Sequence, residues 1–190
     1  MKDERGGCVY SISCTTRRPR EGEVDGKDYN FMTEQEFQKR ATAGEFLEYA
    51  RVHGNLYGTL KSSVLEYLKD GVDVLMDIDT RGAELVRSNP DPLIQMCYTD
   101  VFIMPQDLHE LRKRLSSRGT ESDAQLELRM RNAIDEMRHW NEYTYLILSG
   151  DRDEDLNNLH GILTGERQKT MRLKESPEPV EERQAELFEE

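Results

Sequence analysis

Residues 13–23 read Ser-Cys-Thr-Thr-Arg-Arg-Pro-Arg-Glu-Gly-Glu, and this stretch decides how the rest of the chain is interpreted. Arg17 and Arg20 stand three residues apart beside hydroxyl side chains, in a segment that Pro19 keeps from forming an ordinary helix. An arginine guanidinium offers a planar fork of N–H donors that fits two phosphate oxygens at once. The stretch predicts a loop that binds a small phosphate monoester, although by itself it fits a solvated basic turn equally well.

Further segments that follow in order along the chain favour the phosphate site over the basic turn. They are Glu45–Ala50 (EFLEYA), Gly54–Thr59 (GNLYGT), Val74–Asp79 (VLMDID) and Arg112–Glu121 (RKRLSSRGTE). Together with the run TTRRPREGEVDGKDY at residues 15–29, this series resembles the guanylate kinases of bacterial type, which transfer a phosphoryl group from ATP to GMP. The resemblance extends from about Val9 to about Lys174, and the run at 15–29 is its most specific motif.

The resemblance implies an α/β fold of the P-loop type of nucleoside monophosphate kinases, with a mostly parallel sheet flanked by helices. We expect residues 1–174 to form the guanylate-kinase-like domain, with a GMP-binding subdomain at 12–60 and a lid at 110–134. Residues 175–190 are acidic and poor in large apolar side chains, so a disordered tail is expected there.

The hydrophobic pattern independently predicts alternating strands and helices, as an α/β domain requires. Strands are expected at 8–14, 29–32, 46–53, 72–79, 101–105 and 145–149, with a turn region at 54–58. Helices are expected at 33–44, 62–71, 81–88, 106–117, 123–142 and 154–173. Thr33 is the predicted cap of the first helix, with Glu36 as its capping-box partner.

One feature of the family does not occur in these 190 residues. Guanylate kinases begin with a strand and a loop of the form G-x-x-G-x-G-K-[ST], whose amides and lysine hold the ATP phosphates. Here Gly6 and Gly7 are followed by Cys-Val-Tyr. We therefore expect a chain that starts late and lacks the first strand and the phosphate loop. Loss of a central strand leaves its neighbours unpaired, so the chain is expected to be unstable or aggregation-prone alone.

The composition limits the possible partners and location. The chain has 26 Lys and Arg against 38 Asp and Glu, and its net charge of −12 argues against nonspecific binding to nucleic acid or to an anionic membrane. It has no apolar run long enough for a membrane helix and no signal peptide. Cys8, Cys14 and Cys97 fit free thiols in a reducing cytoplasm, where we expect the protein. The four histidines are scattered and predict no metal cluster.

Recognition of GMP requires a site for a dianion and an acceptor for the N–H donors of guanine, and a carboxylate is the fitting acceptor. The resemblance implies that the phosphate is held by Arg17, Arg20, Tyr29 and Tyr57. It implies that guanine is read by Glu48 and Asp79, with hydroxyl partners at Ser13 and Thr59. Without the surrounding pattern, Glu48 would be taken for an exposed strand carboxylate, and core packing at a strand end is the alternative for Tyr29 and Tyr57.

The same resemblance assigns the groups that act on the donor side. Arg114, Arg118 and Arg129 match lid arginines that close over ATP and neutralise charge on the transferred phosphoryl group. Asp77 resembles a carboxylate close to Mg²⁺ and the phosphates, acting through water. ATP and Mg²⁺ are thus the expected donor and cofactor, with the metal held mainly by phosphates. The alternatives are a basic helix face for the arginines and a solvated strand end for the aspartate.

Two other functions stay open. A non-catalytic guanylate-kinase-like module that binds GMP or a phosphopeptide would tolerate the loss of an ATP site. A kinase for another nucleotide is disfavoured by the two carboxylates at 48 and 79. We expect the chain to bind GMP and, without the phosphate loop, to show little turnover; the sequence predicts no oligomeric state.

Overall fold

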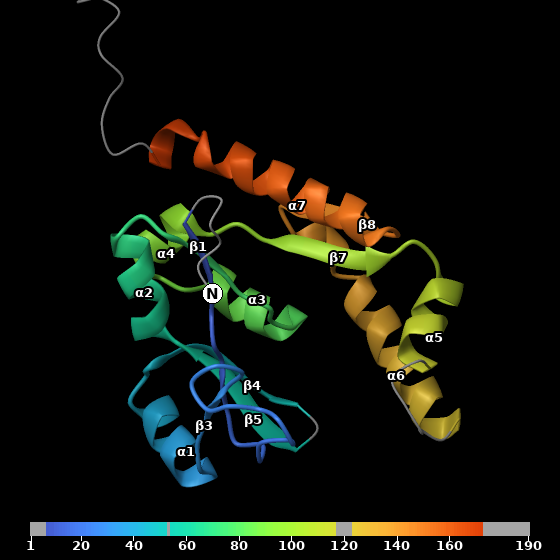
Figure 1. Cartoon of the computed structure of the whole chain (residues 1–190), viewed down its shortest axis with the longest axis horizontal. Coiled ribbons are helices and arrows are strands. Elements are labelled where there is room, and N and C mark those ends of the chain that lie inside the picture. The colour runs from blue at the N-terminus through green and yellow to red at the C-terminus, as the bar shows by residue number, and fades with distance from the viewer. Residues whose placement is uncertain (1–6, 53, 117–122, 173–190) are drawn as a thin grey trace, which may run out of the picture. The chain divides into compact units, whose positions relative to one another are not determined.

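The structure, a computed structural model, describes residues 7–52, 54–116 and 123–172 (Figure 1). Strands and helices alternate along most of this length, which confirms the predicted α/β class. The chain divides into two compact units, Met1–Asp100 and Val101–Glu190. The expected tail at 175–190 lies outside the described residues.

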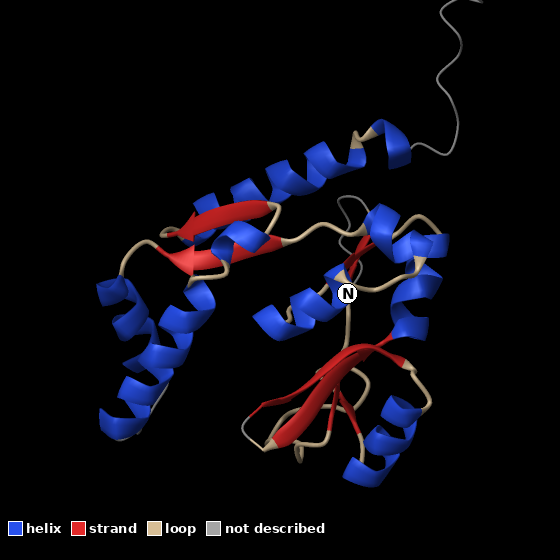
Figure 2. Ribbon diagram, turned by 180° about the vertical axis from the view of Figure 1, so that it is seen from behind, coloured by secondary structure: helices blue, strands red, loops and turns tan. Residues whose placement is uncertain are grey.

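The first unit contains a four-stranded sheet in the order β3-β2-β5-β4. Its strands are β2 (Cys14–Thr15), β3 (Asn30–Phe31), β4 (Phe46–Val52) and β5 (Asn55–Leu60). The strands β4 and β5 form an antiparallel hairpin, and α1 (Glu34–Thr42) lies beside the sheet (Figure 2). Thr33 caps α1 as predicted, accepting a hydrogen bond from the Glu36 amide at 3.2 Å. The rings of Phe37 and Phe46 stack at 4.3 Å and anchor the helix in the core.

The strand β5 corrects the prediction of a turn region at 54–58. Gly54, with φ of 86°, makes the turn of the hairpin, and the chain is extended from Asn55 onward. Gly58 belongs in this strand because the neighbouring strand lies very close to it. A Cβ atom at this position would lie 2.7 Å from Cβ of Tyr49 and 2.8 Å from the carbonyl oxygen of Glu48.

A second, two-stranded sheet of the same unit pairs β1 (Cys8–Tyr10) with β6 (Asp73–Leu75) in parallel. Both strands are shorter than predicted. The amide of Ser11 still donates to the carbonyl of Leu75 at 2.9 Å, but the chain then leaves β1 to join the other sheet as β2. The helices of this region are α2 (Lys61–Lys69), α3 (Thr80–Arg87) and α4 (Pro92–Cys97).

The helix α4 was not predicted, and α2 starts earlier than predicted. Asp91 caps α4 with its side chain, and Pro92 occupies the first helical position, where its missing N–H costs nothing. The helix α2 begins at Lys61, without a side-chain cap, rather than at Ser62 or Ser63. Buried residues of this region form one cluster: Leu47, Val64, Val86 and Ile94.

The second unit contains a parallel pair, β7 (Val101–Pro105) and β8 (Tyr145–Ser149), at the predicted positions. The helices α5 (Leu108–Ser116) and α6 (Asp123–Met137) lie side by side, and α7 (Arg152–Arg167) runs along β8 (Figures 1 and 2). Two short 3₁₀ turns follow α6 and α7, at Trp140–Glu142 and Thr170–Arg172. The helix α7 starts two residues earlier than predicted because Asp151 caps it.

A buried carboxylate joins the end of α7 to β8. Glu166 is 1% exposed and accepts a hydrogen bond from the Tyr145 hydroxyl at 2.8 Å. Its oxygens also lie 2.6 Å from Nζ of Lys169 and 3.5 Å from a guanidinium nitrogen of Arg172. One carboxylate therefore connects strand, helix and the following turn.

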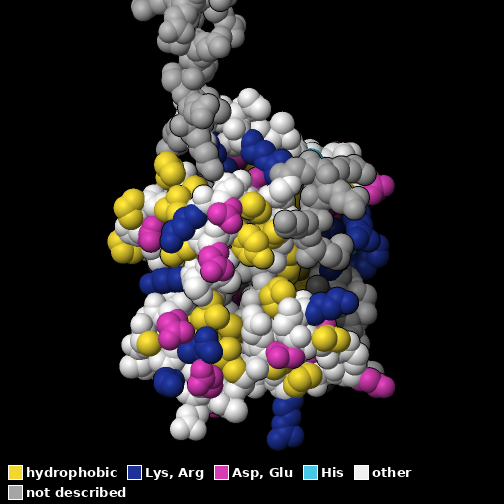
Figure 3. Space-filling model, turned by 60° about the vertical axis from the view of Figure 1, so that its left-hand side comes forward, with side chains coloured by type: hydrophobic (Ala, Val, Ile, Leu, Met, Phe, Trp, Pro, Cys, Tyr) yellow, Lys and Arg dark blue, Asp and Glu magenta, His cyan; other side chains and the backbone are white. Residues whose placement is uncertain are grey.

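The surface mixes charge types. On the face drawn in Figure 3, acidic, basic and apolar side chains are interspersed rather than separated into large patches. Among the helices that the structure describes, none combines the length and the apolar character needed to cross a membrane.

Candidate functional site

A cavity of about 220 Å³ in the first unit brings together residues from five separate parts of the sequence. Six of the predicted site residues line it: Ser13, Tyr29, Glu48, Tyr57, Asp77 and Asp79. The other lining residues, which the sequence analysis did not single out, are Tyr10, Asp28, Ala50, Val52, Gly58 and Ile78. The cavity therefore has carboxylates and hydroxyls on its walls, as a polar ligand requires.

Glu48 is a buried carboxyl group on the wall of this cavity, only 6% exposed. It stands opposite Thr59 in the β4–β5 register, and Thr59 is buried as well. Burial raises the pKa of Glu48. Hydrogen bonding with Thr59 acts to lower this pKa, and the charge of Asp79 acts to raise it further. A buried acceptor that faces a cavity needs a donor from the ligand, because a charge left unpaired there is costly.

Asp79 has a second role that the sequence analysis did not predict. It is the N-cap of α3, and its Oδ1 accepts a hydrogen bond from the Gly82 amide at 2.7 Å. Gly82 lets the two carboxylates approach the helix start. A Cβ atom there would lie 3.0 Å from Oε2 of Glu48 and 3.2 Å from Oδ1 of Asp79. The sequence signal was available, since Asp before a helix is a preferred cap.

Arg17 lies at one side of this site, against aromatic rings. Its Cζ is 5.3 Å from the ring centre of Tyr29 and 5.9 Å from that of Phe31. The hydroxyl of Tyr57 interacts with the same guanidinium, and the rings of Tyr29 and Tyr57 meet at 6.0 Å. Three of the residues predicted to bind the phosphate, Arg17, Tyr29 and Tyr57, therefore lie together. Neither Arg17 nor Arg20 is among the residues that line the cavity, and the side chain of Arg20 is exposed.

Glu23 contacts both Arg17 and Arg20, a role that was not predicted from the sequence. Its carboxylate accepts from the Arg17 guanidinium at 2.8 and 3.0 Å and from the Arg20 amide at 2.7 Å. Hydrogen bonding from Arg17 lowers the pKa of Glu23, so the group is ionised at neutral pH. A lone glutamate in a charged loop carries no sequence pattern that would have revealed this contact.

The predicted lid arginines belong to the second unit. Arg114 is held by Glu110, at 2.9 Å from its Nε, and donates to the Ser149 hydroxyl at 3.0 Å. Arg129 lies on α6, and Arg118 lies outside the described residues. The assignment of these arginines to the donor nucleotide therefore stays a prediction.

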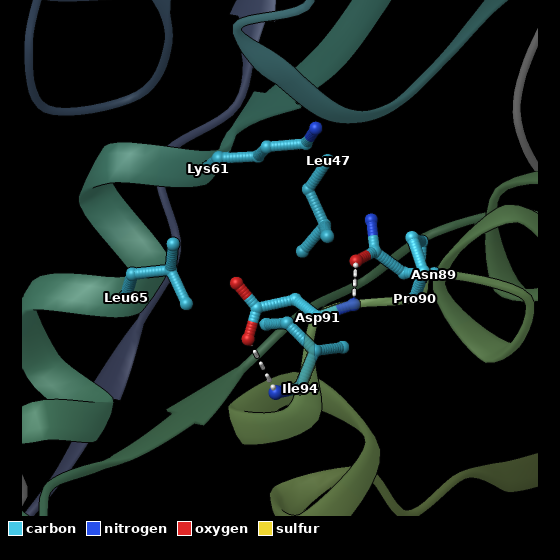
Figure 4. Close-up of a pocket in the computed structure, with 7 residues that line it drawn as sticks. All are labelled: Leu47, Lys61, Leu65, Asn89, Pro90, Asp91 and Ile94. Atoms are coloured by element: carbon cyan, nitrogen blue, oxygen red, sulfur yellow. Dashed lines mark hydrogen bonds between the residues drawn. The ribbon is translucent and has the colours of Figure 1, made fainter.

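A second cavity of the first unit, of about 300 Å³, contains none of the predicted site residues (Figure 4). Leu47 lines it, whereas the next residue, Glu48, lines the first cavity, because successive residues of a strand point to opposite faces. Asp91 stands on its wall and uses its carboxylate to cap α4. Within the described residues, no group of three or more His, Cys, Asp or Glu side chains is placed to hold a metal ion.

Comparison with known proteins gives one consistent match over nearly the whole chain. The family model described as guanylate kinase matches residues 1–166. A guanylate kinase of Maricaulis maris is 44% identical over 165 residues, which is 86% of this chain and 73% of that protein. One of Thermotoga maritima is 41% identical over 164 residues, or 86% and 77% of the two chains.

A solved structure agrees with these sequence matches. The crystal structure of guanylate kinase from Anaplasma phagocytophilum has a TM-score of 0.73 and 33% identity, and the match covers 87% of this chain and 79% of that one. Fold and relatives define the class as nucleoside monophosphate kinase. Within that class, the chain belongs to the guanylate kinase family, whose members use ATP as phosphoryl donor, generally with Mg²⁺.

Proposed function

We propose that the cavity of the first unit is the acceptor site of the guanylate kinase reaction and binds GMP. The observation that carries this proposal is that Glu48, Asp79 and Ser13 line one cavity. Tyr29 and Tyr57 line it too, and Arg17 lies against the ring of Tyr29. A carboxylate accepts from N1–H and N2–H₂ of guanine but meets only an acceptor at N1 of adenine, so this pair favours guanine.

The phosphate of GMP is assigned to Arg17, Tyr29 and Tyr57, with Arg20 reaching it from the same loop. Arginine and tyrosine donors suit a dianion, and the arginine fork binds two oxygens together. The ATP phosphates would carry Mg²⁺, which keeps several waters and needs few protein ligands. Asp77, on the cavity wall, is the carboxylate available to orient such water.

In the full reaction we assign Arg114, Arg118 and Arg129 to the charge on the transferred phosphoryl group. GMP and ATP are the proposed partners, and the role of the family in nucleotide metabolism supports a cytoplasmic location. The 190 residues contain no G-x-x-G-x-G-K-[ST] loop. A protein made of these residues alone is therefore expected to bind GMP with turnover below about 1 per second.

Calorimetric titration of the purified chain with GMP and with AMP tests the proposal. We expect GMP to bind about a hundredfold more tightly than AMP, because the buried acceptors reject a base that lacks the matching donors. A parallel assay of ADP formation measures turnover. Equal affinity for the two nucleotides, or displacement of GMP by a phosphoserine peptide at similar concentration, would favour the non-catalytic binding module instead.

Two substitutions at Asp79 separate its two roles. Asparagine keeps a side-chain oxygen for the Gly82 amide, so Asp79→Asn is expected to preserve the thermal midpoint while weakening GMP binding about tenfold. Asp79→Ala removes the cap as well and is expected to cost about 1 kcal/mol of stability in addition. Thermal melting and GMP titration of both variants provide the check. Unchanged GMP affinity in the asparagine variant would remove Asp79 from the guanine site.

A further inference from the structure

The carboxylate of Glu23 binds two of the residues that are proposed to hold the phosphate, Arg17 and Arg20. Its two oxygens take the forked pair of N–H groups from Arg17, at 2.8 and 3.0 Å. One of these oxygens also accepts from the backbone amide of Arg20, at 2.7 Å. The loop between the two arginines is therefore tied to a single side chain, and only 15% of the Arg17 side chain and 19% of the Glu23 side chain are exposed.

The contacts of Arg17 define which of its donors remain for a ligand. A guanidinium has five N–H groups. Glu23 takes two of them and the carbonyl of Arg18 takes a third, at 2.9 Å. The Nε–H group and one N–H of Nη2 are left, and the Tyr57 hydroxyl interacts with the same guanidinium. The aromatic rings of Tyr29 and Phe31 support the group from its face.

We propose that Glu23 is a positioning residue for the phosphate of the bound nucleotide. It holds the Arg17 guanidinium by one edge, so that the remaining donors and the Tyr57 hydroxyl face the phosphate together. The inference rests on the proposed function of the cavity as a GMP site. Preorganisation of this kind increases affinity because the side chain is already ordered before the ligand arrives.

The opposite role for Glu23 predicts an effect of opposite sign. A carboxylate on an arginine fork also resembles a bound phosphate and could compete with one. If Glu23 competes, its removal tightens GMP binding, and loss of a negative charge near an anion site acts in the same direction. If Glu23 positions Arg17, its removal weakens GMP binding in spite of the charge effect.

The deciding experiment compares Glu23→Gln with the wild-type chain in titrations with GMP and with guanosine. Glutamine has one acceptor oxygen in place of two and breaks the fork. We expect about a tenfold loss of GMP affinity with guanosine affinity unchanged, because guanosine has the base contacts without the phosphate. The matched control is Glu21→Gln, which removes the same charge from an exposed position of the same loop and is expected to leave both affinities near those of the wild type.

A double-mutant cycle identifies the group through which Glu23 acts. In an Arg17→Lys background, the added Glu23→Gln change is expected to have no further effect on GMP, because lysine cannot form the fork. Tighter GMP binding by Glu23→Gln would overturn the proposal, as would an equal loss for GMP and guanosine or no loss at all. Failure of the wild-type chain to bind GMP would instead refute the proposed function, and the positioning role with it.

Discussion

Glu48→Gln is expected to weaken GMP binding about a hundredfold, since a neutral amide replaces the ionised acceptor of two guanine donors in a buried site. The amide also presents its own N–H₂ group to guanine, which leaves donors facing each other. AMP affinity is expected to stay the same or to increase, so discrimination between the bases collapses. Calorimetric titration with both nucleotides measures this change directly.

The stability of the same variant separates loss of function from loss of fold. Burial raises the pKa of Glu48 above its ordinary value of 4.5, so ionising it costs more in the folded chain than in the unfolded chain. Its contribution to stability is complete below that ordinary value and is lost as the pH rises through the raised pKa. At neutral pH, Glu48→Gln is therefore expected to melt no lower than the wild type. Glu66→Gln, on the exposed side of α2, is the control for a simple change of charge.

The pH dependence of binding should have the opposite sign. Guanine donors require the ionised carboxylate, so affinity is expected to rise as the pH increases through the raised pKa of Glu48. Guanosine is the better probe here, because a phosphate monoester itself titrates near pH 6, at about its second pKa. In Glu48→Gln this rise should disappear. A wild-type guanosine affinity that does not change as the pH rises from the ordinary value of 4.5 to about 8 would contradict the role of Glu48.

Glu166→Ala is expected to destabilise the second unit by about 3 kcal/mol, the lower end of the cost of breaking a buried charge pair. The truncation leaves the Tyr145 hydroxyl and the cationic groups of Lys169 and Arg172 without this shared carboxylate. The low end applies because the Lys169 side chain is 44% exposed and keeps much of its hydration. We expect a fall of about 10 °C in the thermal midpoint.

Trp140 makes this prediction specific to one unit. It is the single tryptophan of the chain and lies in the second unit, so its fluorescence follows unfolding there. Gln168→Ala, an exposed position at the same end of α7, is the matched truncation and should have little effect. A change of 1 kcal/mol shifts the thermal midpoint of a chain of this size by roughly 2 °C or more. A midpoint for Glu166→Ala within about 2 °C of the control would therefore show that the carboxylate is dispensable.

The acid behaviour of Glu166 follows from its partners. Burial by itself would raise the pKa of Glu166, but hydrogen bonds from Lys169 and Tyr145 outweigh it, and the pKa is lowered. Its stabilising contribution is present above the ordinary value of 4.5 and is lost as the pH falls through the lowered pKa. Glu48 and Glu166 therefore respond to acid in opposite directions, although both are buried.

The parts of the fold that could be predicted are those whose pattern is local. The strands β7 and β8 appear at the predicted residues because each is a short apolar run bounded by polar residues. The cap at Thr33 follows from side-chain chemistry within one turn of helix. Residues 54–58 were predicted to be a turn region because they contain two glycines. Gly58 is instead required by the close approach of Tyr49 on the neighbouring strand, a contact that the sequence does not reveal.

The candidate site shows the same division. The resemblance named six of the residues that line the cavity, from motifs scattered between Ser13 and Asp79. It did not name Glu23, Gly82 or the capping role of Asp79, each of which depends on a distance between atoms. Residue identity thus indicated which chemistry is present, and the structure was needed to show how the side chains are held.

The double use of Asp79 restricts how this site can change in evolution. A substitution there changes the proposed base contact and, unless the new side chain can also cap α3, costs about 1 kcal/mol of stability in the same step. Glu48 caps no helix, and its replacement by glutamine is expected to leave the melting temperature at neutral pH no lower than that of the wild type. Variants with a new base preference are therefore more accessible through codon 48 than through codon 79, and a lineage that drifts toward another nucleotide would be expected to lose its glutamate first.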